Sequence, residues 1–340
     1  MAVAQGSRSV TVGRRISAAV CKCDFRLEGV LMDEAAVKTV ARSFEQLISR
    51  VRTFQATAED FVAPEDVSFD GDPAWVEVML SSRQVHDEDF TIFRHFDASM
   101  GVILDVGAHW GYSVGSIRAA GSNCPVISIE VSAALSACLQ RVKELDAFGY
   151  DFIVSAVGER PGSLEFYTPA INGRTISGLT TANFDILGDD MVANISRDFA
   201  RYGVEAASYR CQFLRARRRV DGIDNILRDN VLSVPRSPIA AIKMDVEGFE
   251  LPALRGAAQT LAEHKPLLLL ESGNREPDVR ALLEAAGYVL AARVGSQLRL
   301  SGGVSAGLNG IFVHPDRQRL YESKGLFLAD TSLDDRGSLA

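Results

Sequence analysis

The chain has 340 residues, a length that predicts about two domains or one large α/β domain with additions. Apolar residues make up 47% of it and charged residues 24%, as in ordinary globular proteins, which argues against disorder over most of the chain. The 36 basic and 44 acidic residues give a formal net charge of −8. Phosphate contacts need a basic surface, so this balance argues against a nucleic-acid partner.

Cysteine content and hydropathy indicate the cellular compartment of the protein. No apolar run approaches the ~20 residues that span a bilayer, and residues 1–13 lack the apolar core of a secretory signal. The five cysteines are odd in number and show no framework of spacings, as expected of reduced thiols. The sequence therefore predicts a cytoplasmic protein with no membrane span.

A long helix is predicted near the N-terminus. Apolar residues recur at steps of three and four over residues 33–55, the pattern of an amphipathic helix. This helix either caps the core or serves as a dimer interface or substrate lid, so a homodimer is a candidate assembly. Residues 88–96 predict a short helix that leads into the main domain. We expect residues 1–85 to form an N-terminal helical cap or extension.

From residue 101 onward, apolar strands alternate with amphipathic helices. The predicted strands are 102–106, 126–130, 151–157, 239–245 and 266–271. The helices predicted between and after them are 113–120, 132–146, 251–264 and 278–286. Such alternation specifies a doubly wound α/β sheet, mostly parallel, with helices on both faces. We expect this domain over residues 86–316, with an insertion at about 159–220 after the third strand, antiparallel closing strands, and a C-terminal tail at 317–340.

The first strand leads into a glycine loop, Asp105-Val-Gly107-Ala-His-Trp-Gly111. Glycine lets the backbone turn sharply and approach a ligand closely, and this turn lies at the carboxyl ends of the strands, where open α/β sheets bind ligands. Glu130 ends the next strand, where its carboxylate can accept hydrogen bonds from both hydroxyls of a ribose. The Gly-x-x-x-Gly spacing departs from the dinucleotide fingerprint, and Asp105 would repel a pyrophosphate. The loop suits a cofactor with a cationic end, such as S-adenosylmethionine.

A second charged motif, Ile242-Lys-Met-Asp-Val-Glu-Gly248, follows the insertion. If the segment is extended, Lys243, Asp245 and Glu247 share one face. A central parallel strand is apolar on both faces, so these charges indicate either a mutually satisfied ion cluster or a catalytic crevice. Glu271 ends the next strand and is expected beside them. Asp245, Glu247 and Glu271 are also suitable ligands for a divalent cation such as Mg²⁺, although a metal is not favoured.

The chain resembles the FkbM family of S-adenosylmethionine-dependent methyltransferases over about residues 88–315. The resemblance rests on segments 103–111, 129–130, 242–250, 254–256 and 270–271. It implies a class I methyltransferase (Rossmann-like) fold with a mostly parallel seven-stranded sheet and an antiparallel closing strand. It also implies O-methylation of a hydroxyl on a small molecule or on a sugar or glycoside. His109 and Trp110 depart from the family, which commonly has Asn and a small aliphatic residue there.

These motifs together predict the site residues. The residues expected at S-adenosylmethionine, or at its product S-adenosylhomocysteine, are Asp105, Gly107, Ala108, His109, Gly111, Tyr112, Ser113, Glu130, Ala156, Val157 and Asp245. A neutral hydroxyl needs a base to accept its proton during in-line methyl transfer. Asp245 or Glu247 is the expected base, with Glu271 beside them and His109 as an alternative. Asp245 could instead hold the methionine end, and Lys243 would neutralise the acids or steady the substrate oxygen.

Three other functions stay open at this point. An NAD-dependent oxidoreductase is disfavoured by the missing third glycine and by the acidic motif, and a non-catalytic cofactor-binding scaffold by the intact acids. An N-methyltransferase would need less help from a base. The basic run 215–219 is either a solvated edge or a grip for an anionic group, and residues 175–181 are a candidate part of the acceptor pocket.

Overall fold

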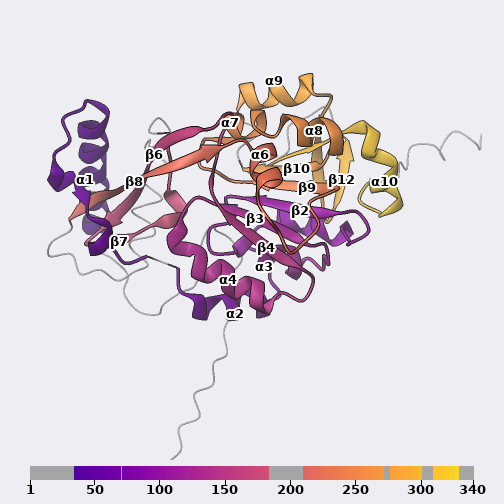
Figure 1. Cartoon of the computed structure of the whole chain (residues 1–340), viewed down its shortest axis with the longest axis horizontal. Coiled ribbons are helices and arrows are strands. Elements are labelled where there is room, and N and C mark those ends of the chain that lie inside the picture. The colour runs from indigo at the N-terminus through magenta and orange to yellow at the C-terminus, as the bar shows by residue number, and fades with distance from the viewer. Residues whose placement is uncertain (1–33, 70, 184–209, 272–275, 301–308, 329–340) are drawn as a thin grey trace, which may run out of the picture.

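The computed structural model describes residues 34–69, 71–183, 210–271, 276–300 and 309–328 (Figure 1). The remaining parts of the predicted N-terminal extension, insertion and C-terminal tail lie outside the described residues. Among the described helices, none combines the length and the apolar composition that crossing a bilayer requires.

An eight-stranded sheet forms the centre of the molecule, in the order β12-β11-β13-β10-β9-β2-β3-β4. The strands are β2 (Val102–Val106), β3 (Val126–Glu130), β4 (Tyr150–Val154), β9 (Ile239–Met244), β10 (Leu267–Glu271), β11 (Val289–Val294), β12 (Gln297–Leu300) and β13 (Asn309–Val313). The five from β4 to β10 pair in parallel, and β13, β11 and β12 are antiparallel. This confirms the doubly wound class. The sheet has eight strands rather than the seven expected for the fold class, and β12 at its edge pairs with β11 across a turn at Gly295, where φ is +61°.

Helices cover both faces of this sheet (Figure 1). The helices are α2 (Pro73–Ser81), α3 (Tyr112–Ala119) and α4 (Ser136–Leu145) on one face, and α6 (Ile223–Asp229), α7 (Glu250–Arg255), α8 (Ala258–His264) and α9 (Pro277–Ala285) on the other. Successive strand residues face opposite sides, so Ile103 packs in one apolar cluster with Val114 and Leu104 in the other with Leu254. The five residues of β2 are all buried, as expected of a central parallel strand.

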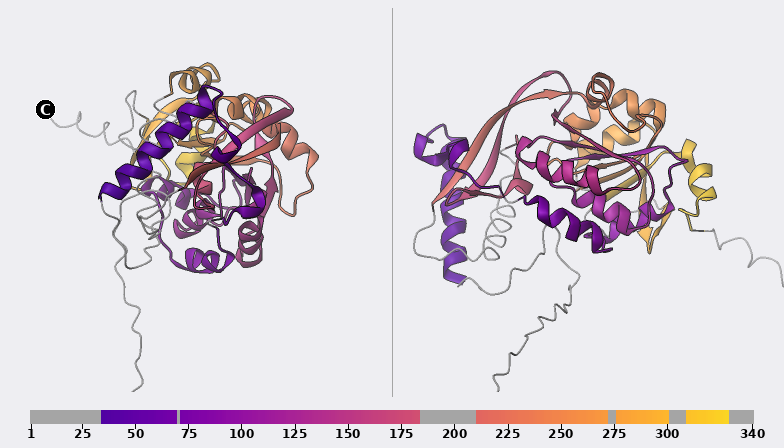
Figure 2. Two further views of the ribbon diagram at one scale, coloured as in Figure 1. Left: turned by 90° about the vertical axis from the view of Figure 1, so that its left-hand side faces the viewer. Right: turned by 60° about the horizontal axis from the view of Figure 1, so that its bottom comes forward.

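The insertion builds most of a second sheet beside the first, with β1 added from the N-terminal extension and β5 from the segment before the insertion. Its strands are β1 (Phe61–Val62), β5 (Ala156–Val157), β6 (Gly162–Ile171), β7 (Arg174–Thr175) and β8 (Cys211–Asp221). The long strands β6 and β8 pair antiparallel from Gly162↔Val220 to Ile171↔Cys211. At its other edge, β8 pairs with β5, which follows β4 of the main sheet. Figure 2 shows the two long strands running from the main sheet out to α1.

Helix α1 (Glu34–Arg52) packs on this second sheet. The Phe44 and Phe213 rings meet edge to face with centroids 6.2 Å apart, and both side chains are fully buried. At the end of the helix, Arg50 binds the Asp60 carboxylate through Nε and Nη2, which fixes α1 to the turn before β1. The predicted helix is therefore present, and within the described residues it caps the insertion rather than the main sheet.

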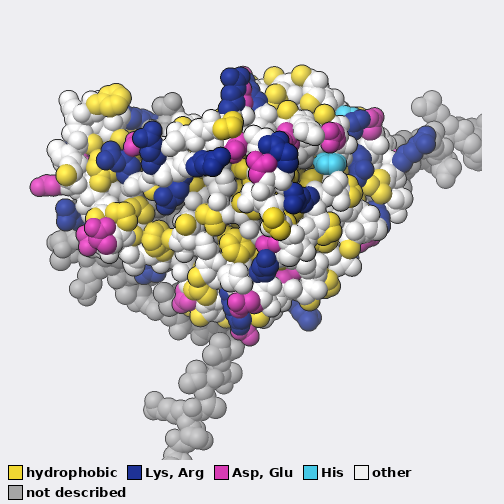
Figure 3. Space-filling model, viewed as in Figure 1, with side chains coloured by type: hydrophobic (Ala, Val, Ile, Leu, Met, Phe, Trp, Pro, Cys, Tyr) yellow, Lys and Arg dark blue, Asp and Glu magenta, His cyan; other side chains and the backbone are white. Residues whose placement is uncertain are grey.

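The basic run lies on β8. Figure 3 shows basic side chains spread over the face that carries β6 and β8. Arg215, Arg217, Arg218 and Arg219 are exposed, and the Arg215 guanidinium lies 4.5 Å from the centre of the Phe61 ring. None of these four arginines lines the pocket described below. Their placement agrees with the interpretation of a solvated edge.

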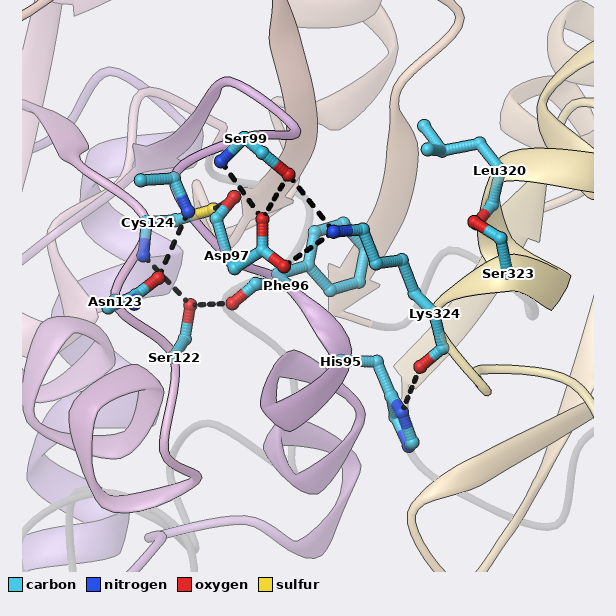
Figure 4. Close-up of polar contacts among 11 residues, drawn as sticks. His95, Phe96, Asp97, Ser99, Ser122, Asn123, Cys124, Leu320, Ser323 and Lys324 are labelled. Atoms are coloured by element: carbon cyan, nitrogen blue, oxygen red, sulfur yellow. Dashed lines mark hydrogen bonds and ion pairs between the residues drawn. The ribbon is translucent and has the colours of Figure 1, made fainter.

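The described C-terminal segment is fastened to the amino-terminal edge of the main sheet (Figure 4). After α10 (Gln318–Ser323), the Lys324 ammonium binds Asp97 Oδ2 at 2.5 Å and Ser99 Oγ at 3.0 Å. The His95 Nδ1–H donates to the carbonyl of Lys324 at 3.0 Å. Tyr321 is fully buried, so the predicted tail begins as part of the packed structure.

Candidate active site

A pocket of about 990 Å³, open space at its mouth included, lies at the carboxyl ends of β2, β3 and β9. This is the edge at which open α/β sheets bind ligands. The predicted site residues that line it are Gly107, Ala108, His109, Tyr112, Ser113, Glu130, Ala156, Val157, Lys243, Asp245 and Glu247. The structure thus brings the glycine loop, the strand-ending acid and the acidic motif to one cavity.

The glycine loop passes directly against the acidic motif. Gly107 has φ +76°, and a Cβ there would lie 1.7 Å from the backbone oxygen of Asp245, so no larger residue fits without moving the chain. Gly107 and Ala108 both donate their N–H to the carbonyl of Ile129 at the end of β3, at 2.9 and 3.3 Å. The close approach of two backbones explains why the sequence needs glycine at this position.

The Glu130 carboxylate holds the glycine loop by a hydrogen bond. Its Oε2 accepts a 2.7 Å hydrogen bond from the His109 N–H, and its Oε1 accepts one of 2.8 Å from the Ser132 N–H. The residue is only 6% exposed, and burial raises the pKa of its carboxyl to about 7 despite these two backbone donors.

Asp105 lies behind the pocket wall rather than on it. Its carboxylate is fully buried, accepts a 3.0 Å hydrogen bond from Ser128 Oγ, and lies 3.4 Å from the ammonium of Lys243. Lys243 also donates to the Gly107 carbonyl at 2.9 Å and lies 3.9 Å from Asp245 Oδ2. The charged motif is therefore partly an internal ion cluster, and the same ammonium group faces the crevice.

The acids of the second motif lie on a turn after β9, which ends at Met244. The sequence predicted a strand through residue 245. The chain instead turns at Glu247 and Gly248, whose φ angles of +50° and +83° are left-handed. One carboxylate oxygen from each of Asp245, Glu247 and Glu271 can be chosen so that all three lie within 4.8 Å of one another. Three oxygens at such spacing can share a proton or contact one small cationic or hydroxylated group.

Two predicted cofactor residues and one predicted catalytic residue do not line the pocket: Asp105, Gly111 and Glu271. Gly111 precedes α3 with φ +104°, and a Cβ there would lie 2.7 Å from the Val142 side chain, so its role is to fit the helix against α4. Glu271 reaches the acidic cluster from β10.

Several contributors were missed in the sequence. Glu250 accepts a 3.1 Å hydrogen bond from the Val246 N–H and so holds the acidic turn, and burial raises the pKa of its carboxyl to about 7. His86, Phe166 and Phe249 line the pocket from three separate segments. Phe249 and Glu250 directly follow the charged motif, so their position in the sequence could have indicated that they belong to the site. His86 and Phe166 reach the pocket only through tertiary packing.

The insertion supplies one wall of the pocket, as expected for residues 175–181. Ser177, Gly178 and Thr180 line it, the first two within η5 (Ser177–Leu179). Ser177 Oγ and His109 Nε2 are 2.6 Å apart, and the His109 ring lies parallel to Tyr112 with centroids 6.4 Å apart. His109 thus connects the glycine loop to the insertion.

A doubly wound sheet with this loop, strand-ending acid and acidic turn defines a class I methyltransferase. The sequence profile of the methyltransferase FkbM domain matches residues 105–290, more than half of the chain. The chain therefore belongs to the FkbM family of S-adenosylmethionine-dependent methyltransferases. No curated protein matches it in sequence.

Solved structures similar to the chain include methyltransferases. The methyltransferase FkbM from Methylobacillus flagellatus KT is 15% identical over 82% of this chain, with a TM-score of 0.36, and the chain spans 58% of that protein's length. The precorrin-6y C5,15-methyltransferase of Geobacter metallireducens GS-15 is 9% identical over 76% of this chain and 97% of its own, with a TM-score of 0.32. The O-methyltransferase from Bacillus cereus is 12% identical over 83% and 91%, with a TM-score of 0.28.

Proposed function

We propose that this chain transfers the methyl group of S-adenosylmethionine to a hydroxyl oxygen of a small molecule, including a sugar or glycoside. The observation that carries the proposal is the meeting of Glu130, the Gly107 turn and the carboxylates of Asp245 and Glu247 in one pocket. A ribose-binding acid and candidate bases are thus available to the same bound cofactor and acceptor.

The pocket residues fit the cofactor. The Gly107 turn leaves no side chain between the ligand and the backbone. Each Glu130 oxygen accepts one backbone bond and has a lone pair left for a ribose hydroxyl. Ala156 and Val157 offer apolar surface to the adenine, and Asp245 offers a carboxylate to the ammonium of the methionine end. When bound, the cofactor supplies an electrophilic methyl group and leaves as a neutral thioether.

Glu247 or Asp245 accepts the proton of the acceptor hydroxyl as the new carbon–oxygen bond forms. His109 is less suited to that work, because its Nε2 is already engaged by Ser177. If Asp245 holds the ammonium, Glu247 is the base, with Glu271 beside it. Lys243 offsets the charge of Asp105 and Asp245 and so keeps the acids from repelling one another.

The first test is calorimetric titration with S-adenosylhomocysteine and, separately, with NAD⁺. We expect micromolar binding of S-adenosylhomocysteine only. Glu130→Ala should abolish it, and Glu165→Gln, an exposed acid on β6 that does not line the pocket, should leave it intact. Binding of NAD⁺ without S-adenosylhomocysteine would overturn the proposal. A panel of hydroxylated and amine acceptors with labelled S-adenosylmethionine then tests oxygen as the methyl-accepting atom.

A further inference from the structure

Residues 177–183, here called the strap, join the two functional loops of the pocket. At one end, Ser177 Oγ lies 2.6 Å from His109 Nε2 of the glycine loop. At the other end, Thr181 Oγ1 donates to the backbone carbonyl of Glu247 at 3.0 Å. Asn183 Nδ2 donates to the carbonyl of Gly248 at 3.4 Å. One short segment of the insertion therefore contacts both motifs of the methyltransferase core.

The strap is itself fixed to the second sheet. Thr181 and Tyr167 of β6 exchange backbone hydrogen bonds of 3.1 and 2.9 Å, and Thr181 is 1% exposed. The hydroxyls of Thr168 and Thr180 are 2.8 Å apart. Because the strap is bound to a well-paired strand, a displacement of either pocket loop is resisted by the whole β6–β8 pair.

His109 links the strap to the candidate cofactor site. Its backbone N–H binds Glu130 Oε2 at 2.7 Å, and its side chain binds Ser177. The residue has φ +53°, a conformation that costs energy in a residue with a side chain and persists where surrounding contacts impose it. Two hydrogen bonds, one to the His109 backbone and one to its side chain, thus connect the proposed ribose-binding carboxylate through His109 to the opposite wall.

We propose that Ser177 is a positioning residue that couples occupancy of the cofactor site to the conformation of the acceptor-side wall. The inference rests on the proposed function, because it takes Glu130 to contact the bound cofactor. A ligand on Glu130 further restrains the His109 backbone, the imidazole then holds Ser177 more firmly, and the strap opens less often from the acidic turn. The wall that receives the acceptor is consequently stabilised by the cofactor.

Hydrogen exchange with S-adenosylhomocysteine as the probe tests this coupling without an acceptor. The reporter amides are those of Leu179, Thr180 and Thr181, which donate to Ile176, Ser177 and Tyr167 respectively. In the wild type, saturation with the probe should slow exchange both at residues 107–111 and in the strap. The effect in the strap should be on the order of 5- to 150-fold, the usual range for coupled sites.

Four variants distinguish the contribution of the Ser177 hydroxyl from a general effect on folding. Ser177→Ala should keep the slowing at residues 107–111 and lose it in the strap, whereas Ser177→Thr, which keeps a hydroxyl, should retain both. Ser163→Ala is the matched control, since its hydroxyl binds Arg217 on β8 and does not line the pocket. His109→Asn, which tolerates the left-handed backbone, should reproduce Ser177→Ala and serves if that variant fails to fold.

The outcomes distinguish the inference from the function on which it rests. Equal strap protection in Ser177→Ala and the wild type overturns the role of Ser177. If the probe slows exchange at residues 107–111 of the wild type but not in the strap, the coupling is overturned and the proposed function still stands. Absence of any binding by the probe overturns the proposed function, and the inference with it.

Discussion

The ammonium of Lys243 on β9 lies 3.4 Å from the fully buried carboxylate of Asp105 on β2. The two residues are direct cross-strand neighbours in the parallel sheet. Lys243 also binds the carbonyl of Gly107, so this ion pair holds the glycine loop as well as balancing a buried charge. The core of the fold and the floor of the pocket therefore depend on the same contact.

Lys243→Met should destabilise the protein by about 3–5 kcal/mol, because it leaves the Asp105 carboxylate buried without a counter-charge. Denaturant unfolding measures the loss. The double variant Lys243→Met/Asp105→Asn should recover part of it, and a double variant no more stable than the single one would contradict the explanation. Lys143→Met is the control: its pair with Asp151 has a lysine side chain 34% exposed, so the loss should be at most about 1 kcal/mol.

Gly107→Ala and Gly121→Ala separate backbone strain from steric conflict. Both glycines have a left-handed backbone, at φ +76° and +100°. A Cβ at Gly121 meets nothing within 4 Å, whereas one at Gly107 would lie 1.7 Å from the Asp245 carbonyl. Gly121→Ala should cost only the strain of about 1–2 kcal/mol. Gly107→Ala should cost more and abolish binding of S-adenosylhomocysteine in calorimetry; normal binding would show that the acidic turn is free to move aside.

Glu250→Gln should change the pH dependence of stability. Burial raises the pKa of Glu250 from 4.5 to about 7, so wild-type unfolding free energy falls as pH rises from about 4.5 through about 7. The variant lacks this titration. Relative to the wild type it should therefore gain up to about 3 kcal/mol between pH 4.5 and pH 8.

Thermal unfolding of both proteins across that range checks the prediction. Glu263→Gln is the control, since this acid is exposed on α8. A difference in unfolding free energy between the Glu250 variant and the wild type that is the same at every pH would contradict the prediction.

The sequence predicts the parts of this site that are encoded locally. The apolar strand β2, its glycine turn and the acid ending β3 are adjacent in the chain and signalled by residue type alone. The strand before Asp245 was also predicted, but not its end at Met244. The extended pattern continued through Glu247, whereas the chain leaves the strand after Met244 and turns at Glu247 and Gly248.

Contacts between distant segments could not be predicted in this way. His109 and Ser177 are 68 residues apart, and their contact depends on the register of β6 with β8 and on the docking of the second sheet. Asp105 was expected to face the cofactor, but its placement behind the wall follows from its pairing with Lys243, which a strand pattern does not reveal. Glu250 was not among the predicted site residues, and its burial comes from tertiary packing.

Chelation tests whether the acidic cluster of Asp245, Glu247 and Glu271 needs a metal. In the proposed reaction these carboxylates accept a proton and bind the ammonium group of the cofactor. Dialysis against EDTA should therefore leave methyl transfer and the Tm unchanged. Added MgCl₂ should not raise the Tm. Loss of activity on chelation, restored by Mg²⁺ in the wild type but not in Glu271→Gln, would instead make the cluster a metal site.

Replacing the acids by their amides identifies the base and the type of acceptor atom. With a hydroxyl acceptor, Glu247→Gln should lower kcat about 10²–10⁴-fold, the usual contribution of a general base, while the Kd for S-adenosylhomocysteine stays the same. Asp245→Asn should weaken cofactor binding as well, if its carboxylate holds the ammonium. Glu165→Gln should change neither quantity. An amine acceptor whose kcat survives both substitutions would show that the enzyme methylates nitrogen, because a neutral amine attacks the methyl carbon without first losing a proton.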